Sequence, residues 1–91
     1  MERLSPKNQN RLAHLGIIIA TMRRKSGMNQ YELAKKAKIS RSLLSTIEAP
    51  GMTKNFSLEV LFKIADALEA DPISILHSAE VFSLISQKPT I

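Results

Sequence analysis

The sequence predicts an all-α domain of five short helices. Apolar residues recur three and four positions apart along most of the chain, helix-start signals occur at five places, and no stretch alternates apolar and polar residues as a strand would. With 91 residues the chain suits one small domain, because a chain this short buries only a limited core. We expect that domain to cover residues 1–80 and residues 81–91 to form a C-terminal tail.

The longest helix is expected from Pro6 to about Lys25. Ser5 is a favoured N-cap, and Pro6 suits the first helical position, where no backbone N–H is needed. Gly27 ends the helix, after basic residues that place positive charge at the negative end of the helix dipole. The apolar residues of this segment form one stripe that we expect to be buried: Leu12, Leu15, Ile18, Ile19 and Met22.

Residues 29–48 are expected to form two short helices joined by a tight turn. Asn29 and Glu32 make a capping box, so the first helix starts at Gln30 and ends near Lys36. Ser40 caps the second helix, Arg41 to Glu48. This helix would be marginal alone in water, so it must be held by an apolar side. The inward residues of the two helices are Leu33, Ala34, Ala37, Leu44 and Ile47.

The outward side of the second helix carries one long and three short polar side chains. These are Arg41, Ser42, Ser45 and Thr46. Two helices joined in this way are the sequence form of a helix-turn-helix, whose second helix reads the DNA major groove. Arg41 is long enough to form two hydrogen bonds with guanine, and its alternative role is to clamp a phosphate. The short residues either hydrogen-bond to bases, with the Thr46 methyl touching a thymine methyl, or form an ordinary solvated helix face.

Two more helices are expected after the loop of residues 49–56. Ser57 caps the first of them and Asp71-Pro72 starts the second, which we place from Pro72 to about Glu80 with Ile73 and Leu76 inward. The tail is either a dimerisation surface or a flexible end, and its apolar residues are Phe82, Leu84 and Ile85. The first of these two helices has an inward stripe of Leu58, Leu61, Ile64, Ala65 and Leu68.

Basic residues are concentrated in the first half of the chain. Up to Lys54 there are eleven Lys and Arg against three acidic residues, a net charge of +8, whereas residues 55–91 carry two against five, a net charge of −3. This asymmetry predicts a polyanionic partner for the first half only. A solvated basic surface is the plainer alternative for a small protein.

Composition argues against several other classes of protein. The absence of cysteine excludes a disulfide framework and a thiolate metal site, and fits a reducing cytoplasm. The most apolar run, residues 15–20, is far shorter than the ~20 residues that span a bilayer, so we expect no membrane partner. His14 and His77 lie far apart without metal-ligand spacing, and no serine lies in a nucleophile motif. We therefore expect no metal, no cofactor and no enzymatic activity.

The helix pattern resembles the lambda-repressor-like fold of the Cro/CI family of DNA-binding domains, also called the xenobiotic-response-element family. The resemblance covers about Leu15 to Leu76, and the ordered set of residues at this spacing is specific although no single residue is. The family's Glu-x-Gly after the third helix is replaced here by Glu48-Ala49-Pro50-Gly51, followed by a longer loop. The residues that carry the resemblance are Met22-Arg23, Gly27-Met28-Asn29-Gln30, Glu32-Leu33-Ala34, Ile39-Ser40, Leu44-Ser45, Ile47-Glu48, and Ser57-Leu58 through Ala65, Ala67 and Leu68.

The resemblance implies that the third helix enters the major groove of double-stranded DNA, with Arg41, Ser42, Ser45 and Thr46 facing base edges. It implies that Gln30 binds a phosphate, helped by the N–H groups of a helix N-terminus. It also implies that Arg23 and Glu48 form a partly buried pair that locks two helices together. The other expected phosphate contacts are Lys35, Lys38, Lys54, Asn55, and either Arg11 or Arg24.

Two functions compete on this evidence from the sequence. The first is a transcriptional regulator, most simply a repressor, that binds a palindromic operator as a homodimer. The second is an antitoxin-like module that neutralises a partner protein and regulates its own operon. The second would place the essential contacts in the acidic half and the apolar tail rather than in the third helix.

Overall fold

Five helices make up the part of the chain that the structure, a computed structural model, describes: residues 4–49, 51 and 55–86. These ranges contain no strand, so the prediction of an all-α fold is confirmed. The first and third helices have the expected bounds, while the second ends at Ala37 and the last continues well past Glu80. The helices are α1 (Pro6–Lys25), α2 (Gln30–Ala37), α3 (Arg41–Glu48), α4 (Leu58–Ala67) and α5 (Pro72–Ser86).

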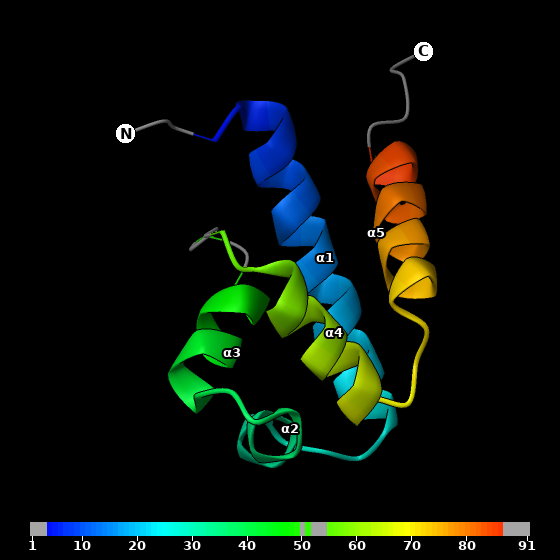
Figure 1. The fold of residues 1–91 in the computed structure, drawn as a ribbon. Helices are drawn as coiled ribbons and strands as arrows, with labels where there is room; N and C mark the ends of the chain where they lie inside the picture. The colour runs from blue at the N-terminus through cyan, green and yellow to red at the C-terminus, as the bar shows by residue number, and fades with distance from the viewer. Residues whose placement is uncertain (1–3, 50, 52–54, 87–91) are drawn as a thin grey trace.

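Helix α1 runs through the middle of the molecule and contacts both α3 and α5 (Figure 1). Helices α2 and α3 form one side, with α2 also packed on α4, and α5 lies beside α1 on the other side (Figure 1). The helix-turn-helix and α5 are therefore separated by α1 and α4. In the helices described, no segment is both long enough and apolar enough to cross a bilayer.

Side-chain caps explain where the helices begin. In each of the first four helices the N-cap oxygen accepts a hydrogen bond from the backbone N–H three residues later, which satisfies a donor that has no partner within the helix. The Asp71 carboxylate similarly accepts from the N–H of Ile73 at the start of α5. The four N-caps are Ser5, Asn29, Ser40 and Ser57, as the sequence predicted.

The centre of the core takes one fully buried aliphatic side chain from every helix. The five are Ile19, Leu33, Leu44, Ile64 and Ile75. Burying a side chain of this size contributes roughly 1.5–3 kcal/mol relative to leaving it exposed. Since each helix contributes one such residue, the short helices α2 and α3 are stabilised by tertiary packing rather than by their own length.

A glycine permits the close packing of α1 on α3. Gly16 is buried in the middle of α1, and a Cβ placed on it would lie 2.0 Å from the backbone oxygen of Ile47 near the end of α3. No side chain fits at that distance, so the two backbones meet there directly. Glycine in a helix interior costs about 1 kcal/mol relative to alanine, and this contact is the reason it is tolerated.

The prediction that Leu58, at the start of α4, faces inward is wrong. Leu58 is 66% exposed, while the remainder of the predicted stripe is buried or half-buried. Phe56, which precedes the cap, packs against the core at this end of the helix instead. A residue in the first turn of a helix can fall on the same helical face as the buried residues and still have no neighbouring helix to cover it.

The prediction that Ile73 and Leu76 form the inward face of α5 is also wrong. Ile73 is 73% exposed and Leu76 is exposed, whereas Ile75, Ala79 and Ser83 are buried. Apolar residues occur on every side of this helix, so periodicity does not identify its inner face. Its packing beside α1 does, and the small side chains of Ala79 and Ser83 lie on the face that is buried.

The C-terminal part of α5 is held against α1 by His14. The His14 Nδ1 and the Ser83 hydroxyl are hydrogen-bonded, and Ser83 donates its own hydrogen to the carbonyl of Ala79. Phe82 packs edge-on against the His14 ring, with 4.8 Å between the ring centroids. These contacts explain why α5 continues to Ser86, into the segment that the sequence analysis described as a C-terminal tail.

We expect Gly16→Ala to destabilise the domain by about 3 kcal/mol, because the new methyl group overlaps the Ile47 carbonyl and forces α1 and α3 apart. Chemical denaturation monitored by circular dichroism measures the effect. Gly51→Ala is the matched control, since a Cβ there has no atom within 4 Å and should change the unfolding free energy little. Equal stability of the two variants would contradict the proposed close contact.

Candidate nucleic-acid interface

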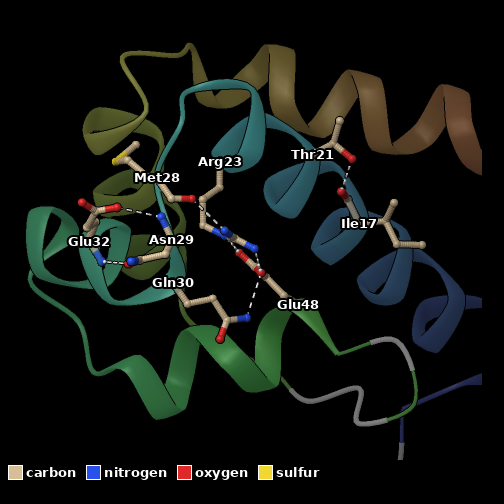
Figure 2. Close-up of polar contacts among 8 residues, drawn as sticks. All are labelled: Ile17, Thr21, Arg23, Met28, Asn29, Gln30, Glu32 and Glu48. Atoms are coloured by element: carbon tan, nitrogen blue, oxygen red, sulfur yellow. Dashed lines mark hydrogen bonds and ion pairs between the residues drawn. The ribbon is translucent and has the colours of Figure 1, made fainter.

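A buried hydrogen-bond network joins α1, α2 and α3 (Figure 2). The Arg23 guanidinium donates to both carboxylate oxygens of Glu48, with Nε–Oε2 at 2.9 Å and Nη2–Oε1 at 3.0 Å. Its Nη1 donates to the carbonyl oxygen of Met28 at 2.8 Å, in the segment that leads into α2. Gln30, the first residue of α2, donates from Nε2 to Glu48 Oε1 at 3.0 Å.

Both charged members of this network are almost completely removed from solvent. The exposed fraction is 7% for Arg23 and 8% for Glu48. Burying charges is costly unless they are paired and fully hydrogen-bonded, and the two-pronged pair with its further partners meets that requirement. Among the described residues, no buried side-chain nitrogen or oxygen lacks a partner. The network therefore fixes the C-terminal end of α3 against α1 and the start of α2.

The start of α2 is fixed a second time by its capping box (Figure 2). The Asn29 side chain accepts from the N–H of Glu32 at 2.8 Å, and the Glu32 carboxylate accepts from the N–H of Asn29 at 2.9 Å. At its other end α2 stops at Lys38, whose backbone is left-handed with φ at 60°. The tight turn that follows brings α3 across α2, with Ile39 packed against the core.

The outward face of α3 lies opposite the buried Leu44 and Ile47. Arg41, Ser42 and Ser45 are exposed there, while Thr46 is half-buried. The Thr46 hydroxyl donates to the backbone carbonyl of Ser42 at 3.0 Å. The four residues that the sequence assigned to base reading are thus on one continuous polar face, in a helix whose other side is held in the core.

The expected phosphate-binding residues have different surroundings. Lys38 and Asn55 are exposed, and Lys35 is exposed with its ammonium 5.9 Å from the centre of the Tyr31 ring. Lys54 lies outside the described residues. The two arginines left as alternatives on α1, Arg11 and Arg24, are both exposed, and Arg11 pairs with Glu80 of α5 at 3.5 Å.

Sequence reasoning missed the hydrogen bond from Gln30 to Glu48 and the structural importance of Gly16. Gln30 was expected to face a phosphate only, and nothing in the sequence indicates its second partner eighteen residues away. Gly16 had a signal, because an unexplained glycine inside a helix usually has a packing reason. Across the described ranges, no three acidic, histidine or cysteine residues gather in a way that would hold a metal ion.

Comparison with protein families gives a match to a helix-turn-helix family. The family model covers residues 19–73, which is more than half of the chain and includes α2, α3 and α4 completely. Among curated proteins, none matches this chain.

Several solved structures are similar to this one. The restriction-modification controller protein C.AhdI from Aeromonas hydrophila is 28% identical, with a TM-score of 0.66 over 70% of this chain and 94% of its own. The controller protein C.Esp1396I bound to a 25 base pair operator site is 26% identical, with a TM-score of 0.72 over 81% and 95%. The clp gene regulator ClgR from Corynebacterium glutamicum is 28% identical, with a TM-score of 0.76 over 84% and 79%.

Breaking the buried pair should destabilise the domain strongly. We expect Glu48→Gln to lower the free energy of unfolding by about 3 kcal/mol, because the Arg23 charge would stay buried without its counter-charge. The same substitution at the exposed pair, Glu80→Gln, should cost at most about 1 kcal/mol. Denaturant titration of both variants measures the difference, and a Glu48→Gln variant as stable as Glu80→Gln would contradict the role given to the network.

Proposed function

The chain belongs to the Cro/CI-type helix-turn-helix family, whose members have the lambda-repressor-like fold, and on that premise we propose that it represses transcription by binding a palindromic operator as a homodimer. Membership makes it a DNA-binding transcriptional regulator, in a family that is not one of enzymes. The observation that carries the proposal is the polar outer face of α3, held in a fixed orientation by the buried network. The operator-bound structure of the similar protein C.Esp1396I supports it.

In this proposal α3 enters the major groove and Arg41 is the principal base reader. Its guanidinium is exposed at the start of the helix, and it can donate two hydrogen bonds to O6 and N7 of guanine. Ser42, Ser45 and Thr46 lie beside it and contact neighbouring base edges. Because three of the four readers are short, the helix must lie deep in the groove, and part of the specificity comes from DNA shape.

Phosphate contacts supply most of the affinity and surround the helix-turn-helix. Gln30 uses one amide hydrogen on Glu48 and keeps a second, which we assign to a phosphate at the N-terminus of α2. Such a contact ties the DNA backbone to the same network that orients α3. Lys35, Lys38, Arg24, Lys54 and Asn55 complete the proposed set of phosphate contacts.

We assign dimerisation to the exposed apolar residues of α4 and α5, of which α5 lies across α1 from α3 (Figure 1). A contiguous patch of exposed apolar side chains commonly marks a site of protein–protein interaction. Phe82 contributes less than the sequence suggested, because it is half-buried against His14. The exposed residues are Leu58, Phe62, Ile73, Leu76, Val81, Leu84 and Ile85.

Selection of bound sequences from a random duplex pool at stated salt concentrations tests the DNA-binding proposal. We expect a two-fold symmetric site with half-sites about 34 Å apart, one DNA turn, and an affinity that falls steeply as salt rises. Affinity that hardly changes between low and moderate salt, or that never exceeds non-specific binding, would overturn the proposal.

A pair of substitutions ties the result of that selection to α3. Arg41→Ala should lose about 10- to 100-fold in affinity for the selected site and relax the preference at one guanine. Lys7→Ala removes the same charge from the exposed first turn of α1, far from α3, and should leave that preference intact. Equal losses in the two variants would mean that Arg41 acts through charge alone.

We expect Leu84→Glu to convert the dimer into a monomer, because it places a charge in the apolar surface of α5. Sedimentation equilibrium measures the change, and Asn10→Glu on the exposed side of α1 is the matched control. A wild-type protein that is already monomeric would contradict the homodimer. If that monomer co-purified with a small partner protein and kept it after Arg41→Ala, the antitoxin-like alternative would be favoured.

A further inference from the structure

The hydrogen bond made by Thr46 limits how this residue can read a base. Thr46 is in the last turn of α3, four residues after Ser42, and its hydroxyl donates to the Ser42 carbonyl. A threonine hydroxyl has a single hydrogen to donate. Because that hydrogen is used inside the helix, Thr46 has none left for a base acceptor such as guanine O6 or thymine O4.

The same bond restricts the Thr46 side chain. Threonine in a helix adopts two χ1 rotamers because its hydroxyl can bond to the preceding turn. Thr46 is half-buried at the edge of the polar face, beside exposed Ser45, and its hydroxyl is tied to the backbone of α3. Among the residues assigned to base reading, Thr46 alone carries a methyl group.

We propose that Thr46 selects thymine through contact between its own methyl group and the C5 methyl of the base, and not by donating a hydrogen bond. Thymine is distinguished from cytosine in the major groove partly by this methyl group, and threonine methyls make such contacts. Ser42 then serves Thr46 through its backbone, as the acceptor that orients it. This inference rests on the proposed entry of α3 into the major groove.

The experiment replaces thymine by uracil, which removes only the C5 methyl, at each thymine of the duplex obtained by selection with the wild-type protein. At one thymine of each half-site we expect wild-type affinity to fall about fourfold, the size expected for losing one buried methyl contact. Thr46→Val keeps a methyl group at that place and should show the same uracil penalty. Thr46→Ser keeps the hydroxyl alone and should bind thymine and uracil duplexes equally.

Thr21→Ser is the control: Thr21 makes the same kind of hydrogen bond, to the carbonyl of Ile17 in α1, but is not part of the proposed reading face, so the uracil penalty at that thymine should stay unchanged. Thermal unfolding of each variant separates an effect on reading from an effect on folding. A uracil penalty that is unchanged in Thr46→Ser would show that a group other than the Thr46 methyl contacts the C5 methyl of the base, which overturns the inference.

A wild-type protein that selects a site but shows no uracil penalty at any position would also overturn the inference, while leaving the proposed DNA binding intact. A wild-type protein that selects no sequence would overturn both. The two proposals therefore fail in distinguishable ways.

Discussion

The buried pair between Arg23 and Glu48 is the contact through which three helices take their relative orientation. It lies where the last turn of α1, the segment before α2 and the last turn of α3 meet, and it also engages Met28 and Gln30. Buried ion pairs are poor sources of net stability, because desolvation offsets much of the attraction. The value of this pair is therefore geometric: it permits one arrangement of the helices and penalises others that would leave a charge without its partner.

The second helix of the helix-turn-helix has only eight residues and needs such external support. Helix α3 is too short to persist alone, and it is held at three kinds of contact: Leu44 in the core, the Ile47 carbonyl against Gly16, and Glu48 on Arg23. All of these lie on one side of the helix. The opposite side carries polar residues that are not part of the hydrophobic core, so the proposed reading of DNA by this face places no demand on the packing.

The arrangement separates two surfaces that a DNA-binding dimer would need. The basic helix-turn-helix is on one side of α1, and the exposed apolar residues of α5 are on the other (Figure 1). His14 and Ser83 connect α5 to the middle of α1, the helix whose C-terminal turn carries Arg23. Helix α1 therefore contacts the helices that carry both surfaces. If two copies associate through α5, this connection would set the distance between their α3 helices.

The sequence alone determined where the helices begin, because the signals for helix starts are local. Caps at Ser5, Asn29, Ser40 and Ser57 depend on residues three positions away, and the inward faces of α2 and α3 follow from clear periodicity. The polar face of α3 was predictable for the same reason.

Only the tertiary structure decided which side of α5 is buried, that Leu58 is exposed, and that Gln30 is bonded to Glu48. In α5 apolar residues occur all round the helix, so its inner face depends on where α1 lies rather than on its own pattern. The same is true of the partner of Gln30 and of the backbone that meets Gly16, since both belong to α3 and come near only when the chain has folded. Contacts within one helical turn are encoded locally, whereas contacts between helices depend on how the complete set packs.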